Sequence, residues 1–171
     1  RKLSRCGVTF EEEMILIGLG ANLSSPEHGD PTATITAALE AIGAADIKVV
    51  ATSRWYSTAP VPVSDQPRFV NIVASLETDQ AAGLLLTVLH GIEEAFGRVR
   101  TARNAARVLD IDLLDYEGLI SDDWPVLPHP RMAERAFVLV PLRDIAPDWH
   151  HPKTGTGLDE LVAGAADLAG V

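Results

Sequence analysis

Apolar residues along this chain repeat with two periods, one typical of strands and one typical of helices. The apolar run over residues 14–20 ends in glycines, which indicates a buried strand that stops at a turn. Apolar residues at alternate positions over 69–78 predict another strand, and residues 48–57 and 108–116 are predicted strands as well. A loop rich in proline separates 48–57 from 69–78.

The most regular helical pattern lies between Gln80 and Gly97, and Gly97 is a typical residue for ending a helix. Apolar residues recur there at helical spacing, at Leu84, Leu85, Val88, Leu89, Ile92 and Phe96. A helix over about 33–43 is expected to be capped by Thr32 or Thr34. Residues 131–146 are expected to be mostly helical, and residues 158–169 to form a last short helix.

The predicted order is strand, helix, strand, strand, helix, strand. That order is typical of a ferredoxin-like α+β domain, an antiparallel sheet with helices packed on one face. Gly18 and Gly20 are interpreted as residues of a tight turn, because Asn22 and Leu23 replace the remainder of a dinucleotide-binding glycine pattern. A turn at Glu117 is expected to lead into a short hairpin partner for the last strand.

The composition adds bounds on size and surroundings. A length of 171 residues favours one domain, which we expect over residues 14–171, with residues 1–13 as an N-terminal extension of no assigned role. The single cysteine, Cys6, excludes an internal disulfide and suits a reducing compartment, so a cytoplasmic location is expected. No apolar run is long enough to span a bilayer, and we expect a monomer that does not bind membranes.

The charged residues are unevenly distributed. A formal net charge of -10 argues against a general nucleic-acid binder, which would need a broad basic surface. Nevertheless, four of the 14 lysines and arginines lie within ten positions that contain no acidic residue: Arg98, Arg100, Arg103 and Arg107. A concentrated arginine cluster in an acidic protein indicates a small polyanion as ligand.

Two carboxylates follow this cluster directly. In a strand, Asp110 and Asp112 point to one face, while Ile111 and Leu113 point to the other. Two such close negative charges repel each other unless a cation lies between them, and Mg²⁺ typically binds one or two carboxylates together with phosphate oxygens. An isolated Asp-x-Asp is more often the solvent-facing side of an edge strand. The neighbouring arginines favour a magnesium and phosphate site instead.

Several ordered motifs between about Met14 and Pro152 resemble the 6-hydroxymethyl-7,8-dihydropterin pyrophosphokinase family. The motifs are Gly20-Ala21-Asn22-Leu23, Tyr56-Ser57-Thr58-Ala59-Pro60, Asp65-Gln66-Pro67 with Phe69 and Asn71, Gly97-Arg98-Val99-Arg100, Arg107 with Asp110 and Asp112, Pro128-His129, Arg135-Ala136-Phe137, and Pro141-Leu142 with Asp144-Ile145-Ala146-Pro147. The basic loop departs from the family, because Asn104-Ala105-Ala106 stands where Arg-Trp-Gly-Pro is common.

The resemblance implies a ferredoxin-like fold and transfer of pyrophosphate from ATP to the hydroxymethyl group of a reduced pterin, in folate biosynthesis. The hydroxymethyl oxygen would attack the β-phosphorus, giving AMP and the pterin diphosphate. Asp110 and Asp112 would bind two Mg²⁺ ions, and Arg98 and Arg107 would be catalytic residues that hold phosphate. The residues implied to bind ATP are Glu93, Arg100, Arg103, Leu113, His129 and Arg135. Arg100 and Arg103 would close over the nucleotide and exclude water.

The pterin ring is implied to stack between Phe69 and Phe137, with Asn71, Thr58 and Val61 along its edge. Without the resemblance, the two phenylalanines would be interpreted as core residues and His129 as a surface residue. Asn71 stands out even alone, because an amide within an apolar strand needs hydrogen-bond partners.

Two alternatives of other classes remain at this stage. One is a ferredoxin-like ligand-binding or regulatory module without turnover, which the altered basic loop favours. The other is an interaction protein that uses its acidic surface, but such a protein would have no reason to place arginines opposite an aspartate pair.

Overall fold

The computed structural model describes residues 14–98 and 106–171, and it confirms the predicted order of elements. The strands are β1 (Ile15–Ala21), β2 (Lys48–Thr52), β3 (Tyr56–Thr58), β4 (Phe69–Glu77) and β5 (Asp110–Tyr116). The α-helices are α1 (Pro31–Ala44), α2 (Ala82–Ala95), α3 (Ala136–Ile145) and α4 (Leu158–Gly164). Short 3₁₀ turns cover Met132–Glu134 and Leu168–Gly170.

The strands form one antiparallel sheet in the order β2-β4-β1-β5, and β3 pairs with the beginning of β4. β1 lies in the middle, because β4 pairs with one of its edges and β5 with the other. This arrangement of a βαββαβ unit is the ferredoxin-like fold that the sequence predicted.

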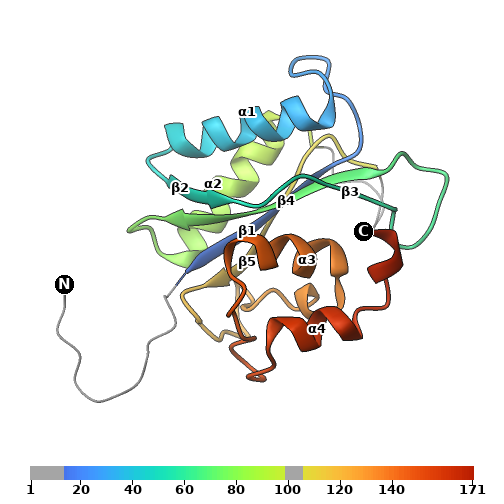
Figure 1. Cartoon of the computed structure of the whole chain (residues 1–171). Coiled ribbons are helices and arrows are strands. Elements are labelled where there is room, and N and C mark those ends of the chain that lie inside the picture. The colour runs from blue at the N-terminus through green and yellow to red at the C-terminus, as the bar shows by residue number, and fades with distance from the viewer. Residues whose placement is uncertain (1–13, 99–105) are drawn as a thin grey trace.

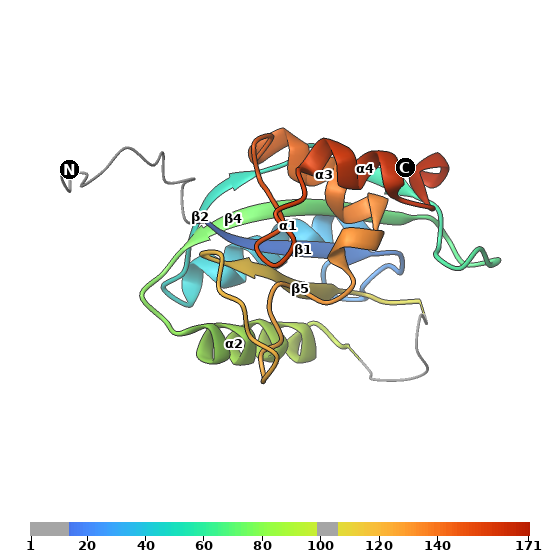
Figure 2. The same cartoon turned by 90° about the horizontal axis from the view of Figure 1, so that it is seen from below.

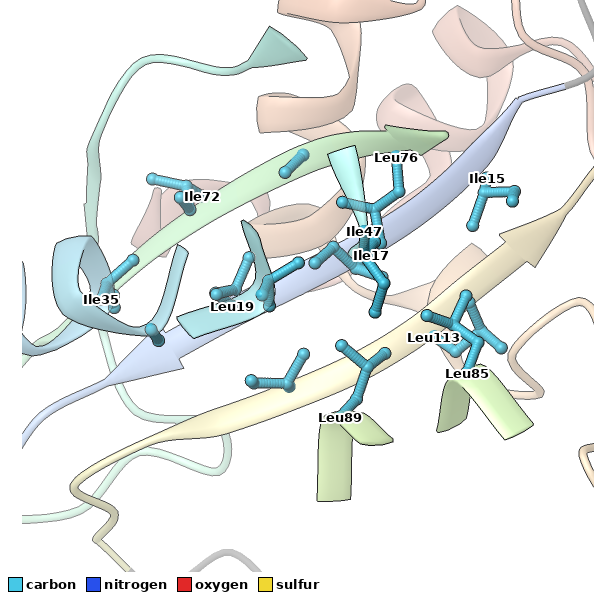
Figure 3. Packing of buried hydrophobic residues seen from close by; sticks show 14 of the residues in the cluster. Ile15, Ile17, Leu19, Ile35, Ile47, Ile72, Leu76, Leu85, Leu89 and Leu113 are labelled. Atoms are coloured by element: carbon cyan, nitrogen blue, oxygen red, sulfur yellow. The ribbon is translucent and has the colours of Figure 1, made fainter. Parts of the chain in front are cut away.

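Helices cover both faces of the sheet, so the prediction of helices on one face was wrong. Figures 1 and 2 show α1 and α2 on one side and α3 and α4 on the other. Because side chains alternate along a strand, Ile15, Ile17 and Leu19 of β1 pack toward α1 and α2. Figure 3 shows this layer, in which these residues meet Leu85 and Leu89 of α2. Leu16 of β1 instead joins the second core, under α3 and α4.

The predicted strand over 48–57 is two strands, β2 and β3, with a break between them. Ser53 causes the break: its backbone N–H donates to the Val73 carbonyl, and its side-chain Oγ accepts from the Val73 N–H at 3.0 Å. The side chain thus replaces a backbone partner in the ladder. The chain then leaves the sheet and returns as β3, which pairs with the beginning of β4, whereas β2 pairs with its end.

Two local predictions are corrected by hydrogen bonds. The cap of α1 is Asp30, whose Oδ1 accepts from the Ala33 N–H at 2.9 Å, and not Thr32 or Thr34. Pro31 is suited to the first helical position, where no N–H partner is available. In the described residues after Glu117, β5 gains no hairpin partner, because Ser121 and Leu127 form only an isolated bridge with each other.

Across the described ranges, no helix has the length and apolar content needed to cross a bilayer.

Candidate active site

A row of three residues across neighbouring strands organises the site. Gly20 of β1 lies opposite Asn71 of β4 on one side and opposite Asp110 of β5 on the other. Gly18 lies opposite Asp112 in the same way. The amide and the two carboxylates are therefore separated by a strand position that carries no side chain. The interpretation of Gly18 and Gly20 as turn residues was wrong, because both lie inside β1 and line the cavity described next.

A cavity of about 460 Å³ lies over these glycines. It brings together seven of the residues predicted from the resemblance: Thr58, Val61, Phe69, Asn71 and Phe137 at one end, and Asp110 and Asp112 toward the other. Arg107 and Arg135, also predicted, line it as well. A volume of this size suits a small-molecule ligand.

The end near Asn71 is largely neutral. The Asn71 amide is buried, and its Nδ2 donates to the Thr58 hydroxyl at 2.7 Å. This bond fixes which edge of the amide faces the cavity, so the side chain is oriented before a ligand arrives. Phe69 begins β4 and Phe137 lies in the first turn of α3, and both are partly buried. Such a pocket suits a flat heterocycle that can both donate and accept hydrogen bonds.

The other end is charged. Asp110 forms ion pairs with Arg98 and with Arg107, and its Oδ1 lies 2.9 Å from Arg98 Nη1. That contact lacks hydrogen-bond geometry, so Oδ1 is a buried acceptor without a hydrogen-bond donor in the described part of the chain. Burial is the main cause that raises the pKa of Asp110, and the nearby charge of Asp112 raises it further.

Asp112 is contacted from the other side of the cavity. Arg135 Nη1 donates to its Oδ2 at 3.3 Å, and His129 Nε2 lies 3.8 Å from its Oδ1. Burial lowers the pKa of His129 and so favours the neutral imidazole, and Arg135 supplies the positive charge beside Asp112. The Arg135 guanidinium also lies over the Phe137 ring, 5.4 Å from its centre. Arg135 therefore touches both ends of the site.

Glu93 and Leu113, predicted to line the adenosine, are both buried on the α2 side of the sheet. Leu113 belongs to the apolar core there. Glu93 Oε1 accepts the Ile111 N–H at 2.6 Å at the free edge of β5 and also pairs with Arg98. Burial raises the pKa of Glu93 to about 7, against the opposing effects of these two contacts. Glu93 thus supports β5 and Arg98 from below the site.

The residues at the charged end fit a bound magnesium ion. Asp110 and Asp112 offer carboxylate oxygens on one sheet face, and Asp110 Oδ1, which has an ion pair with Arg98 but no hydrogen-bond donor among the described residues, is an acceptor that a cation would satisfy. Within the described ranges, no three or more carboxylate, histidine or cysteine groups gather into a complete metal site. Mg²⁺ is typically bound by one or two carboxylates, with substrate phosphates and water as its remaining ligands.

Two predicted residues lie outside the described ranges, and several residues that line the cavity were not predicted. Arg100 and Arg103 fall in residues 99–105, outside the described ranges. The cavity is also lined by residues that the sequence reasoning did not assign: Arg131, Glu134, Gly164, Ala166 and Asp167. Arg131 was visible as part of the arginine excess. The C-terminal residues carry no local pattern that would have placed them here.

Comparison with known proteins identifies the family of this chain. Residues 16–147 match the family model described as 7,8-dihydro-6-hydroxymethylpterin-pyrophosphokinase (HPPK). A protein of Methylorubrum extorquens named 2-amino-4-hydroxy-6-hydroxymethyldihydropteridine pyrophosphokinase is 46% identical over 134 residues, covering 77% of this chain and 82% of the relative. The protein of the same name from Pseudomonas aeruginosa is 42% identical over 153 residues, covering 88% and 91%.

Solved structures share the fold. A crystal structure of an HPPK-DHPS in complex with substrates has a TM-score of 0.64 at 13% identity, and wild-type Plasmodium falciparum HPPK-DHPS has a TM-score of 0.65 at 14%. This chain spans less than half of those longer proteins, 43% and 44%, while 88% of this chain is covered. The family match and the bacterial relatives together show that this chain belongs to the 7,8-dihydro-6-hydroxymethylpterin-pyrophosphokinase family.

Proposed function

We propose that this protein transfers pyrophosphate from ATP to the hydroxymethyl group of 6-hydroxymethyl-7,8-dihydropterin in folate biosynthesis, with Mg²⁺ required. The observation that supports it best is the row formed by Asn71, Gly20 and Asp110, which puts a neutral heterocycle pocket beside a charged end. Neighbouring strands lie about 4.8 Å apart, so the amide and the carboxylate are about two strand spacings apart. A bicyclic pterin with its hydroxymethyl arm spans a gap of that order.

The pterin end would bind and orient the alcohol. Asn71 would donate to and accept from the pterin edge, and the Thr58 hydroxyl holds the amide in place for that task. Phe69 and Phe137 would contact the faces of the ring. Because these groups are neutral, they select by shape and hydrogen bonding, and the hydroxymethyl oxygen is left directed toward the aspartates.

The charged end would hold the triphosphate. Asp110 and Asp112 would bind Mg²⁺, which when bound neutralises charge on the phosphates of ATP. Arg98 and Arg107 neutralise Asp110 in the unliganded protein, and their N–H groups would turn to phosphate oxygens when nucleotide arrives. Arg135 would act similarly beside Asp112, and the neutral His129 would contribute a hydrogen bond to phosphate. We further propose that Arg100 and Arg103 approach the nucleotide from the basic loop.

The bond changes follow from the products. A bond forms between the hydroxymethyl oxygen and the β-phosphorus, and the bond from that phosphorus to the α,β-bridging oxygen breaks. AMP leaves, the pterin diphosphate remains, and one proton is released. The protein contributes by positioning the reactants and neutralising charge, since this class of transfer needs little covalent participation by the enzyme. We expect two Mg²⁺ ions, a monomer and a cytoplasmic location, and the net charge of -10 disfavours nucleic acid as a partner.

Product analysis tests the proposal. Purified protein with ATP, Mg²⁺ and the pterin alcohol should form AMP and pterin diphosphate in equal amounts, and chelation of Mg²⁺ should stop the reaction. Formation of ADP would instead indicate transfer of a single phosphoryl group and contradict the proposal. Binding of ATP that survives removal of Mg²⁺, with no AMP after addition of pterin, would support a binding module without turnover.

A further inference from the structure

The C-terminal segment from Ala166 to Gly170 closes one side of the cavity, although it lies beyond residues 16–147, which match the family. Figure 1 shows this red segment running from α4 past the beginning of α3 toward the end of β3. Ala166 and Asp167 line the cavity directly. Three hydrogen bonds connect the segment to α3 and to the chain around the end of β3, which carry the proposed pterin contacts.

The first connection is to α3. Asp167 Oδ1 accepts the Ala136 N–H at 2.8 Å, at the first residue of that helix. The residue at the cap position, Arg135, makes no capping bond with its own side chain, which reaches Asp112 instead. Asp167 therefore supplies the missing cap from 31 positions further along the chain, and its negative charge is favourable at a helix N-terminus. The next residue is Phe137, so this bond fixes the backbone that carries the ring.

The second connection is to the loop after β3. The Gly170 carbonyl accepts the Ala59 N–H at 2.9 Å and the Arg68 Nη2 donor at 3.1 Å. Ala59 lies between Thr58 and Pro60 in the loop that leads to Val61. Arg68 also holds Ser57, with 2.6 Å from its Nη2 to the Ser57 carbonyl. The Gly170 carbonyl thus anchors the end of β3 and the loop that leads to Val61, both directly and through Arg68.

We propose that this C-terminal segment is a clamp that sets the width of the pterin pocket, with Asp167 as its positioning residue. The inference rests on the proposed function for the identity of the ligand. It adds that Asp167 acts through the Ala136 N–H and Phe137 on the affinity for pterin, while Arg98 and Arg107, which would hold ATP beside Asp110, belong to other segments of the chain. A residue that served only general stability would change the affinities for both substrates or neither.

The matched variants are Asp167→Ala and Asp167→Asn. Alanine removes the acceptor for the Ala136 N–H. Asparagine keeps the accepting Oδ1 and replaces only Oδ2, which has no hydrogen-bond partner among the described residues. A third variant, Gly170→Val, tests the other anchor, because a Cβ at Gly170 would lie 3.3 Å from the Ala59 Cβ and would force the loop to shift.

The clamp predicts that Asp167→Ala raises the KM for pterin about tenfold, the effect expected from losing one helix cap that a bound ligand needs. The KM for ATP should stay within about twofold, and Asp167→Asn should restore most of the loss. Gly170→Val should also raise the KM for pterin selectively. Equal KM values for pterin in the wild type and Asp167→Ala, or equal losses for pterin and ATP, would overturn the inference. Thermal unfolding identifies a variant that fails to fold. If Asp167→Ala fails to fold, the KM values of Gly170→Val are compared with those of Asp167→Asn. A rise in the KM for pterin alone in Gly170→Val supports the clamp, and equal KM values for pterin, or equal losses for pterin and ATP, overturn it.

The same experiment separates failure of the clamp from failure of the proposed function. If the wild type forms no AMP, the proposed function fails whatever the variants do. Calorimetric titration of wild type and Asp167→Ala with the pterin alcohol alone then still tests the clamp. Weaker binding to Asp167→Ala supports it, and equal binding or no binding to both proteins overturns it.

Discussion

The two ends of the cavity are held in their unliganded form by different means. At the Asn71 end, the amide and the Thr58 hydroxyl satisfy each other, and the groups are neutral. At the Asp110 end, charged groups pair with one another, and Arg98 contacts both Asp110 and Glu93. The neutral end is ready to bind with little rearrangement. In the proposed function, the ion pairs at the charged end would exchange partners, so binding there would depend on charge supplied by the ligand and its metal.

The largest effect should come from removing charge at the second end. Asp112→Asn should lower kcat about a thousandfold, because a carboxylate proposed to hold Mg²⁺ and to orient Arg135 is lost. Pterin affinity, measured by calorimetry without nucleotide, should change less than about threefold, since the two ends are separate. Full activity in this variant would show that Asp112 is not a metal ligand. A large loss of pterin affinity would show that the ends are coupled.

The next effect concerns the neutral end. A Cβ at Gly20 would lie 2.6 Å from Asn71 Oδ1, so Gly20→Ala must displace the amide from its bond with Thr58. Pterin affinity should fall about a hundredfold, as expected when a buried polar group loses its alignment, while ATP affinity stays within about threefold. Gly18→Ala is the matched control, because its nearest contact would be Leu114 at an ordinary 3.6 Å. Similar losses in both variants would contradict the role given to Asn71.

The third effect concerns the charged end, where the buried Glu93 should make stability depend on pH. Since the pKa of Glu93 is raised from 4.5 to about 7, the folded protein retains this proton over a pH range in which the unfolded chain has lost it. Its contribution to the free energy of unfolding is therefore lost as pH rises from about 4.5 to about 7. Glu93→Gln should remove that slope and be more stable than the wild type at pH 8 by about 2 kcal/mol.

Denaturant unfolding at pH 5 and pH 8, without nucleotide, measures this difference. Glutamine keeps an acceptor for the Ile111 N–H, so the two proteins should be similar at pH 5. A variant that is less stable than the wild type at pH 8 would show that the pairing of Glu93 with Arg98 outweighs the cost of burying its charge.

The smallest effect should appear at the residue that touches both ends. Arg135→Lys keeps the positive charge near Asp112 but loses the planar group over Phe137. The KM values for ATP and pterin should each rise about fivefold, because the cation–π contact and the hydrogen bond to Asp112 each contribute on the order of 1 kcal/mol. A rise for one substrate alone would assign Arg135 to a single end.

Alternation along strands was sufficient to predict much of the fold and the aspartate pair. Asp110 and Asp112 were placed on one face by counting residues, and the register confirms that they share it. The break at Ser53 was missed because a side chain replaces a backbone partner there, and its partner Val73 lies on another strand, 20 positions away. Asp167 was missed for a related reason: its partner, the Ala136 N–H, is 31 positions away, and no spacing rule covers that distance. Gly20 was wrongly interpreted as a turn residue because its role depends on Asn71 and Asp110, which lie on two other strands.

The glycines of β1 also bear on inhibition. The floor of the cavity at Gly18 and Gly20 is main chain, and a compound resting on it would contact atoms that every amino acid shares. Resistance by substitution would have to add a side chain there, and at Gly20 the added carbon collides with the amide proposed to bind the natural substrate. In a cell carrying such a change, the protein would lose affinity for the compound and for its own pterin substrate together. Resistance to compounds that rest on this main chain should therefore arise first through substitutions of side chains elsewhere in the cavity lining.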